Sequence, residues 1–301
     1  MGSLSESLAR VALLGYFAAG TVLGLALLSS WIGLMGTRIL AGSRLPSSPS
    51  GAHTLRIPPS SVARGLVWLG FAALSLSVAA RTAAAGRPPY ANQYEFAVAF
   101  AWTVLAGYLL LPRERVVRGL TPAVLALALG LLLYASTLPS AITPPVPALQ
   151  NRLLLGLHVG CALVAYGANA VAFVAALLFL AQRQVRVRSG WVRVLPDARL
   201  LDELGYGAVM VSFPMLGATL LLGSWWSSIA WGSYWSWDPK QSATLATWLV
   251  YAAYLHTRVN REWQGRGSAL LLVLGFCATL LTFAGNLFFG GLHSYAGVTD
   301  A

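Results

Sequence analysis

Four histidines are the side chains in this sequence best suited to bind a transition metal, because neutral imidazole is the commonest protein ligand for such ions. His158 lies near the start of a long apolar stretch, and His293 follows a pair of glycines just after the last apolar stretch. His256 ends another apolar stretch, whereas His53 lies in a hydrophilic segment. A histidine at membrane depth is costly and often functional, but it can equally serve helix packing. Taken singly, these histidines leave both roles open.

Tryptophan is concentrated in one segment, 223–241, which reads GSWWSSIAWGSYWSWDPKQ. Five of the eleven tryptophans lie in it: Trp225, Trp226, Trp231, Trp235 and Trp237. An aromatic belt at a membrane interface explains one or two of them, since indole rings favour the headgroup level. Five, interleaved with glycine and serine and accompanied only by the charges of Asp238 and Lys240, favour a surface that binds a large, flat π-system.

The positions of the histidines sharpen this interpretation. His158 and His293 are distant in sequence, yet both are expected at the membrane face that carries the tryptophan-rich segment. Two neutral imidazoles from opposite sides are what a six-coordinate iron porphyrin requires. His256 lies about fourteen residues into its own stretch, roughly 20 Å deeper at about 1.5 Å per residue. The chain has no second histidine at that depth, so an iron bound there takes its opposite ligand from elsewhere.

Two acidic residues stand where helices are expected to begin. Asp238 is followed by Pro239 and Gln241, a pattern typical of a helix N-cap with proline at the first helical position. In the segment YANQYEF, Asn92 and Glu95 form a similar cap, with the carboxylate favoured by the helix N-terminus. Both acids therefore have a structural explanation, and a functional role for Asp238 stays open.

The composition requires a lipid environment around the elements that carry these residues. Of the 301 residues, 57% are hydrophobic and only 10% are charged, whereas a soluble domain carries about a quarter charged residues. This excludes a disordered chain, a disulfide scaffold and an ordinary soluble domain. The net charge of +11 does not indicate nucleic-acid binding, because the arginines lie in the short gaps between apolar stretches.

Eight apolar stretches can cross a hydrocarbon core about 30 Å thick, which takes about 20 residues of helix. They cover residues 11–34, 63–85, 95–111, 119–138, 153–181, 204–224, 242–257 and 268–290, of which the third and seventh are short. We therefore predict an all-α integral membrane protein, a bundle of about eight transmembrane helices with the tryptophan-rich segment in an outer loop. A linker at 35–62, rich in serine, proline and glycine, predicts two domains: 1–62 with the first helix and 63–301 with the other seven.

Positive charge sets the predicted orientation. Fifteen of the 20 basic residues fall in the first, third, fifth and seventh gaps between the apolar stretches. Cytoplasmic loops carry the excess of lysine and arginine, so these gaps are expected in the cytoplasm and both termini outside. His158, His293 and the tryptophan-rich segment then lie at the outer face.

The segment WGSYWSWDPK resembles the WWD signature, WGxxWxWD, of haem-handling proteins, and the signature is complete here. Together with YANQYEF and LHVGCALVAYG before it, and TWLVYAAYLHTR and GLHSYAG after it, the chain is similar to the CcsA/ResC family over essentially its whole length. That family supplies the larger membrane component of the System II cytochrome c synthase.

The resemblance implies a specific haem path. Haem b is the cargo, held at the outer face by the tryptophan-rich segment between His158 and His293, while His256 ligates haem within the membrane opposite a ligand from a ResB/CcsB-type partner. The haem is then presented to the CxxCH motif of apocytochrome c, with thiol-reducing proteins acting indirectly. The implied location is the bacterial cytoplasmic membrane, or the thylakoid membrane of a plastid, with the active face outward.

Two other functions stay open at this stage. A secondary transporter of a hydrophobic solute is one, although we find no inverted repeat of the kind such folds show. A relative from the multi-subunit System I is the other, but those proteins have six spans or about twice this length. No side chain resembles a covalent nucleophile, so as a synthase subunit the chain contributes position and electrostatics while the haem and the thiols supply the chemistry.

Overall fold

The computed structural model describes residues 2–42, 59–111, 114–144, 149, 151–185, 196–258, 265–285 and 288–294. Within these ranges the regular structure is entirely helical, and each predicted apolar stretch forms one helix. The helices are α1 (Gly2–Gly42), α2 (Pro59–Ala85), α3 (Gln93–Leu109), α4 (Glu114–Ser136), α5 (Arg152–Val185), α6 (Ala198–Trp231), α7 (Pro239–Thr257) and α8 (Arg266–Ala284). The predicted all-α fold is confirmed.

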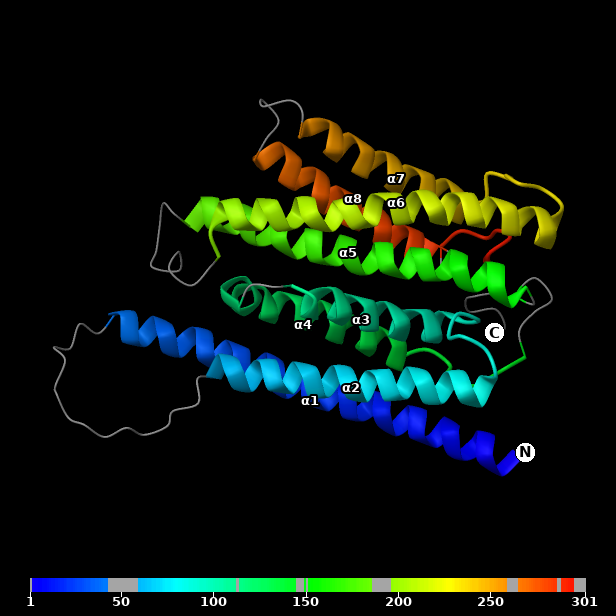
Figure 1. Cartoon of the computed structure of the whole chain (residues 1–301), viewed down its shortest axis with the longest axis horizontal. Coiled ribbons are helices and arrows are strands. Elements are labelled where there is room, and N and C mark those ends of the chain that lie inside the picture. The colour runs from blue at the N-terminus through cyan, green and yellow to red at the C-terminus, as the bar shows by residue number, and fades with distance from the viewer. Residues whose placement is uncertain are drawn as a thin grey trace.

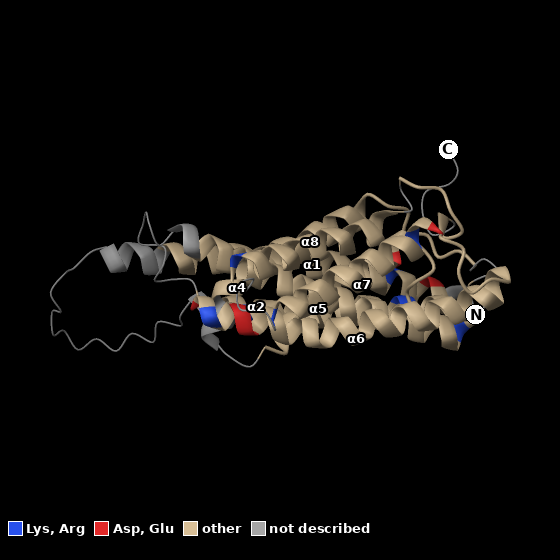
Figure 2. Cartoon of the chain, turned by 90° about the horizontal axis from the view of Figure 1, so that it is seen from above, with Lys and Arg blue, Asp and Glu red and all other residues tan. Residues whose placement is uncertain are grey.

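The helices run side by side along one long axis (Figure 1). The paired helices α1 and α2 form one edge of the bundle, α3 and α4 form its middle, and α5 to α8 form the other side. Helix α5 joins the last two layers, because it packs against α3 as well as against α6 and α8. The lysine, arginine, aspartate and glutamate residues of the described ranges lie mostly toward the two ends of the bundle (Figure 2).

Six of the eight helices are long and apolar enough to cross a membrane: α1, α2, α4, α5, α6 and α8. Helix α3 has 17 residues and α7 has 19 with a polar first turn, which matches the shortness of the third and seventh predicted spans. Most of α3 is buried by its neighbours, so protein rather than lipid surrounds it. The chain is thus a multi-pass membrane protein.

The two ends of the bundle alternate along the chain as the charge pattern predicts. The start of α1 and the connections 86–92, 137–144 and 232–238 lie at one end, and the carboxyl ends of α1, α3, α5 and α7 lie at the other (Figure 1). Which end faces outward stays a prediction. The division into domains 1–62 and 63–301 also stays a prediction, and α1 packs along α2 and α4. Residues 43–58, with most of the predicted linker and His53, lie outside the described ranges.

Two predicted boundaries are corrected. The tryptophan-rich segment is not a loop throughout, because α6 continues to Trp231. No glycine or proline interrupts residues 224–231, and the helix ends only at Gly232, whose φ of 74° favours glycine. The last span was expected to reach residue 290, but α8 ends at Ala284.

Candidate functional site

An open cavity lies at the end of the bundle that carries the tryptophan-rich segment. Its empty volume is about 910 Å³ including the open mouth, within the range of small-molecule sites. Parts of α3, α5, α6 and α7 form its walls, together with the connection after α6 and the segment after α8. The lining residues are mostly apolar, and they include His158 and His293.

The structure brings together the two histidines predicted to act as a pair. The ring of His158, on α5, stacks on Trp226 with centroids 6.2 Å apart and an interplanar angle of 12°. The ring of His293, after α8, lies 5.8 Å from the same indole. Both imidazoles therefore flank one buried tryptophan at the wall of one cavity.

His158 is oriented by the backbone of α6. Its Nδ1 lies 2.9 Å from the carbonyl oxygen of Thr219, and because a carbonyl only accepts hydrogen bonds, Nδ1 donates. The proton is then on Nδ1, which leaves the lone pair of Nε2 able to bind a metal. Gly223 makes this approach possible, since a Cβ there would lie 2.5 Å from Cε1 of His158.

His293 is oriented by a carboxylate. Its Nδ1 donates to Oδ1 of Asp238 at 2.7 Å, so Nε2 is again the free ring nitrogen. Asp238 also accepts hydrogen bonds from the backbone N–H of Lys240, at 2.9 Å, and of Leu292, at 2.6 Å. The aspartate is therefore both the N-cap of α7 and a hydrogen-bond partner of the histidine, and a functional role for it stays a prediction.

The electrostatics around this pair favour a charged acid and a neutral base. Burial raises the pKa of the Asp238 carboxyl, but the hydrogen bond and charge of His293 and the two backbone N–H donors outweigh it, and the pKa falls to about 2. Burial lowers the pKa of His293, and Asp238 opposes that shift only in part. A neutral imidazole is the form that ligates iron.

Gly291 brings the segment after α8 against the start of α7. A Cβ on this residue would lie 2.4 Å from Oδ2 of Asp238 and 3.0 Å from Cδ of Pro239. Only glycine therefore permits the hydrogen bond between the Leu292 N–H and the aspartate. Sequence reasoning did not assign roles to Gly223 or Gly291, although each adjoins a motif that carries a site residue.

The five tryptophans divide into two groups. Trp226 is 1% exposed and meets Trp231 edge to face at 4.6 Å, while Trp231 contacts the ring of His293 at 4.8 Å. Trp235 lines the cavity. Trp225 and Trp237 are 56% and 71% exposed and do not line it. Three indoles thus line the cavity or contact a lining residue directly, and of the two exposed ones Trp237 packs on Trp235 with ring centroids 5.6 Å apart.

His256 lies far from this cavity. It occupies the last turn of α7, at the opposite end of that helix from the cavity, and its side chain is exposed. Arg258, two residues on, donates to Asp202 at 2.6 Å and covers the ring of Tyr206 at 4.8 Å. The arginine is thus held by residues of its own chain.

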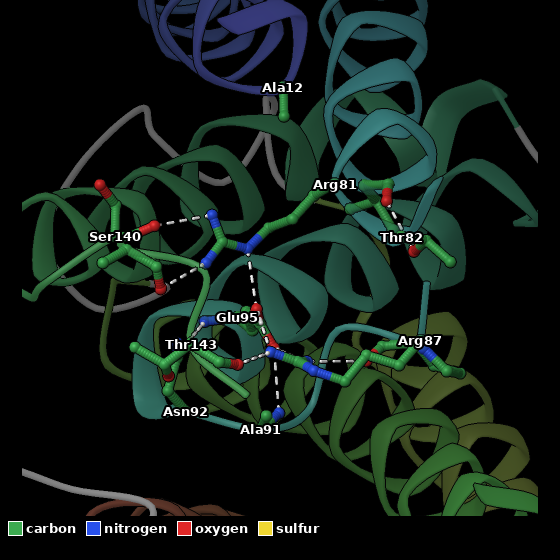
Figure 3. A network of polar contacts seen from close by, with 12 residues as sticks. Ala12, Arg81, Thr82, Arg87, Ala91, Asn92, Glu95, Ser140 and Thr143 are labelled. Atoms are coloured by element: carbon green, nitrogen blue, oxygen red, sulfur yellow. Dashed lines mark hydrogen bonds and ion pairs between the residues drawn. The ribbon is translucent and has the colours of Figure 1, made fainter. Parts of the chain in front are cut away.

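A buried ion-pair cluster holds one wall of the cavity in place (Figure 3). Glu95 of α3 accepts from Arg81 at 2.9 Å and from Arg87 at 2.6 Å. Its backbone N–H donates to Asn92, which confirms the predicted cap. Arg81 also donates to the carbonyl of Ser140. The cluster thereby ties together the end of α2, the start of α3 and the connection after α4. The sequence pattern identified the cap but not the two arginines.

Comparison with known proteins gives a family match. The family model described as cytochrome C assembly protein matches residues 90–293. The cytochrome c biogenesis protein CcsA of Synechococcus elongatus is 33% identical over 288 residues, which cover 77% of this chain and 88% of that protein. CcsA of Parasynechococcus marenigrum is 37% identical over 239 residues, covering 70% and 78%.

A solved structure has a similar fold. The cytochrome c heme lyase CcmF superposes with a TM-score of 0.60 at 21% identity, over 89% of this chain and 46% of that one. The chain thus spans about half the length of this lyase, and the likeness concerns the fold. The family match and the CcsA relatives carry the assignment: this chain belongs to the CcsA family of cytochrome c assembly proteins.

Proposed function

We propose that this protein binds haem b in the cavity, with Nε2 of His158 and of His293 as the two axial ligands. One observation carries the proposal: two imidazoles from α5 and from the end of the chain line one cavity, and each has its Nδ1 hydrogen-bonded. A porphyrin iron with two histidines needs this tautomer at both rings. The largely apolar walls suit a flat macrocycle.

The residues around the ligands then have defined tasks. Thr219 and Asp238 hold the rings in one tautomer and one orientation. Trp226 and Trp231 pack behind the imidazoles and exclude water from them. The open mouth leaves an edge of the haem available to the CxxCH motif of apocytochrome c, whose thiols add to the vinyl groups. Holding vinyl and thiol at reacting distance is the main contribution of the protein.

His256 is proposed as the ligand of a second haem within the membrane. Its exposed side chain at the far end of α7 suits a site shared with another subunit, and we propose a ResB/CcsB-like partner as the source of the opposite ligand. Haem then passes from this inner site to the cavity, which faces outward in the orientation that the charge pattern predicts. The membrane is the bacterial cytoplasmic membrane or its thylakoid counterpart.

The test is purification of the chain with its partner, followed by absorption spectra and maturation of a reporter cytochrome c. His158→Ala and His293→Ala should each remove the low-spin haem signal of the cavity and abolish maturation, and added imidazole should restore part of it by filling the vacant position. His53→Ala is the control and should behave as the unchanged protein. Haem-free protein from the unmodified complex, as a solute transporter would give, or normal maturation by both variants, would overturn the proposal.

A further inference from the structure

Lysine occurs once in this sequence. The other 19 basic residues are arginines, and the single lysine, Lys240, is the second residue of α7 and lines the cavity. The cation at this position thus differs in its chemistry from every other lysine or arginine side chain of the sequence. An ammonium on a flexible stem is a compact point charge, whereas a guanidinium is a planar fork.

Lys240 is the charged side chain of the cavity wall. Histidines apart, the other lining residues within the described ranges carry no charge. Its Nζ lies 5.8 Å from the ring centroid of Phe96, which also lines the cavity. Its positive charge acts on the rings of both His158 and His293. Lys240 therefore lines the same cavity as both proposed axial ligands.

The acid next to Lys240 is already engaged. Asp238 accepts hydrogen bonds from the Lys240 backbone N–H, from the Leu292 N–H and from the imidazole of His293. Its charge stabilises the ammonium, but its oxygens serve the helix start and the histidine. A carboxylate brought by a ligand would add a charge-assisted hydrogen bond to the ammonium at the cavity wall.

We propose that Lys240 anchors a carboxylate of the ligand, so that the cavity selects a flat, apolar molecule bearing an acidic side chain. The inference rests on the proposed function, in which that group is a haem propionate. Two axial imidazoles hold the iron but leave the macrocycle free to rotate about the line between them. A carboxylate fixed at Lys240 removes that rotation and sets which ring edge faces the substrate thiols.

The test compares two probes, iron protoporphyrin IX and its dimethyl ester, which lacks the free carboxylates. Binding to the haem-depleted complex is followed by the low-spin absorption bands. The unmodified protein should prefer the diacid by roughly tenfold or more, as a hydrogen bond between charged groups implies. Lys240→Gln should remove this preference by weakening the diacid and leaving the diester unchanged, and Lys240→Arg should retain part of it. Arg152→Gln, which removes an exposed cation at the same end of the bundle, should keep the preference.

A second measurement needs no substitution at the site. Lys240 carries the sole side-chain amine, so an amine-reactive reagent modifies one internal peptide, which mass spectrometry separates from the N-terminus. The diacid should protect Lys240 from modification and the diester should not. If both probes protect Lys240 equally, or if Lys240→Gln weakens the binding of both probes equally, Lys240 does not anchor a carboxylate. Low-spin binding in that case would still support His158 and His293 as the axial ligands. Absence of low-spin binding by either probe would overturn the anchor together with the proposed function.

Discussion

Two buried carboxylates at the same end of the bundle both lie near the start of a helix but have different partners. Glu95 and Asp238 each lie at the start of a helix, and they are 0% and 5% exposed. Glu95 faces two guanidinium groups. Asp238 faces an imidazole and two backbone N–H groups. The first arrangement neutralises permanent charges, and the second orients a base.

Asp238 is the N-cap of α7, whereas Glu95 lies in the first turn of α3 and is capped by Asn92. The difference teaches that the partners of a buried acid near a helix start decide what it does. A carboxylate that is paired with two arginines links separate segments of the chain, and its charge is already balanced without a ligand. A carboxylate that accepts from one imidazole nitrogen leaves the other nitrogen directed and basic. Glu95 therefore belongs to the frame of the cavity, and we propose that Asp238 takes part in its chemistry by orienting His293.

The largest effect is expected at Glu95. Glu95→Gln leaves two buried guanidinium groups without a counter-charge, which costs about 3–5 kcal/mol of stability. The amount of folded protein in membranes and its thermal unfolding in detergent measure this loss. Glu203→Gln is the matched control, because its exposed pair with Arg199 is worth at most about 1 kcal/mol. Equal stability of the two variants would contradict a framing role for Glu95.

Asp238→Asn should separate function from folding. Asparagine still caps α7, so stability should change little. Its NH2 group cannot accept from the Leu292 N–H as Oδ2 does now, and the negative charge beside the imidazole of His293 is lost. We expect a loss of cytochrome c maturation of about 10–100-fold, the range for a lost partner of a metal-bound histidine. Unchanged haem spectra and maturation in this variant would show that Asp238 is only a cap.

Gly291→Ala tests the same hydrogen bonds without altering the acid. The added methyl would lie 2.4 Å from Oδ2 of Asp238, so the segment that carries His293 must move away. Overpacking of this kind costs about 1–3 kcal/mol, and we expect roughly tenfold weaker haem binding. Gly290→Ala has nothing within 4 Å of the added atom and should bind haem normally. If Gly291→Ala and Gly290→Ala bind haem equally well, the close approach of Gly291 to Asp238 is not needed for haem binding.

The smallest effect is expected at Gly223, beside the histidine that is held by a backbone carbonyl rather than a carboxylate. Alanine there would push the ring of His158 from its present position. A ring displaced from its preferred angle costs about 0.5–1.5 kcal/mol, or roughly a 2–10-fold loss in haem affinity. Gly207→Ala, also on α6 and with open space around it, should be neutral for haem. The two spectra should therefore differ, and identical titrations would count against contact between Gly223 and His158.

Much of the fold could be predicted because transfer of apolar side chains into lipid is a local property. The eight helices, the alternation of their ends and the shortness of α3 and α7 all follow from hydropathy along the chain. The continuation of α6 to Trp231 was missed because tryptophan and serine were interpreted as loop residues. The helix ends instead at Gly232, because glycine adopts a positive φ without steric cost.

The sequence by itself determined the class of protein and its helices, and it predicted that His158 and His293 meet at one end of the bundle, where both line one cavity. The role of His256 stays a prediction. Only the tertiary structure decided that Asp238 serves the histidine as well as its helix, that Glu95 meets two arginines, and that Lys240 shares a wall with both imidazoles. The reason is physical. Hydropathy and capping depend on neighbours along the chain, whereas hydrogen-bond partners and close approaches depend on how distant helices pack within a few tenths of an ångström.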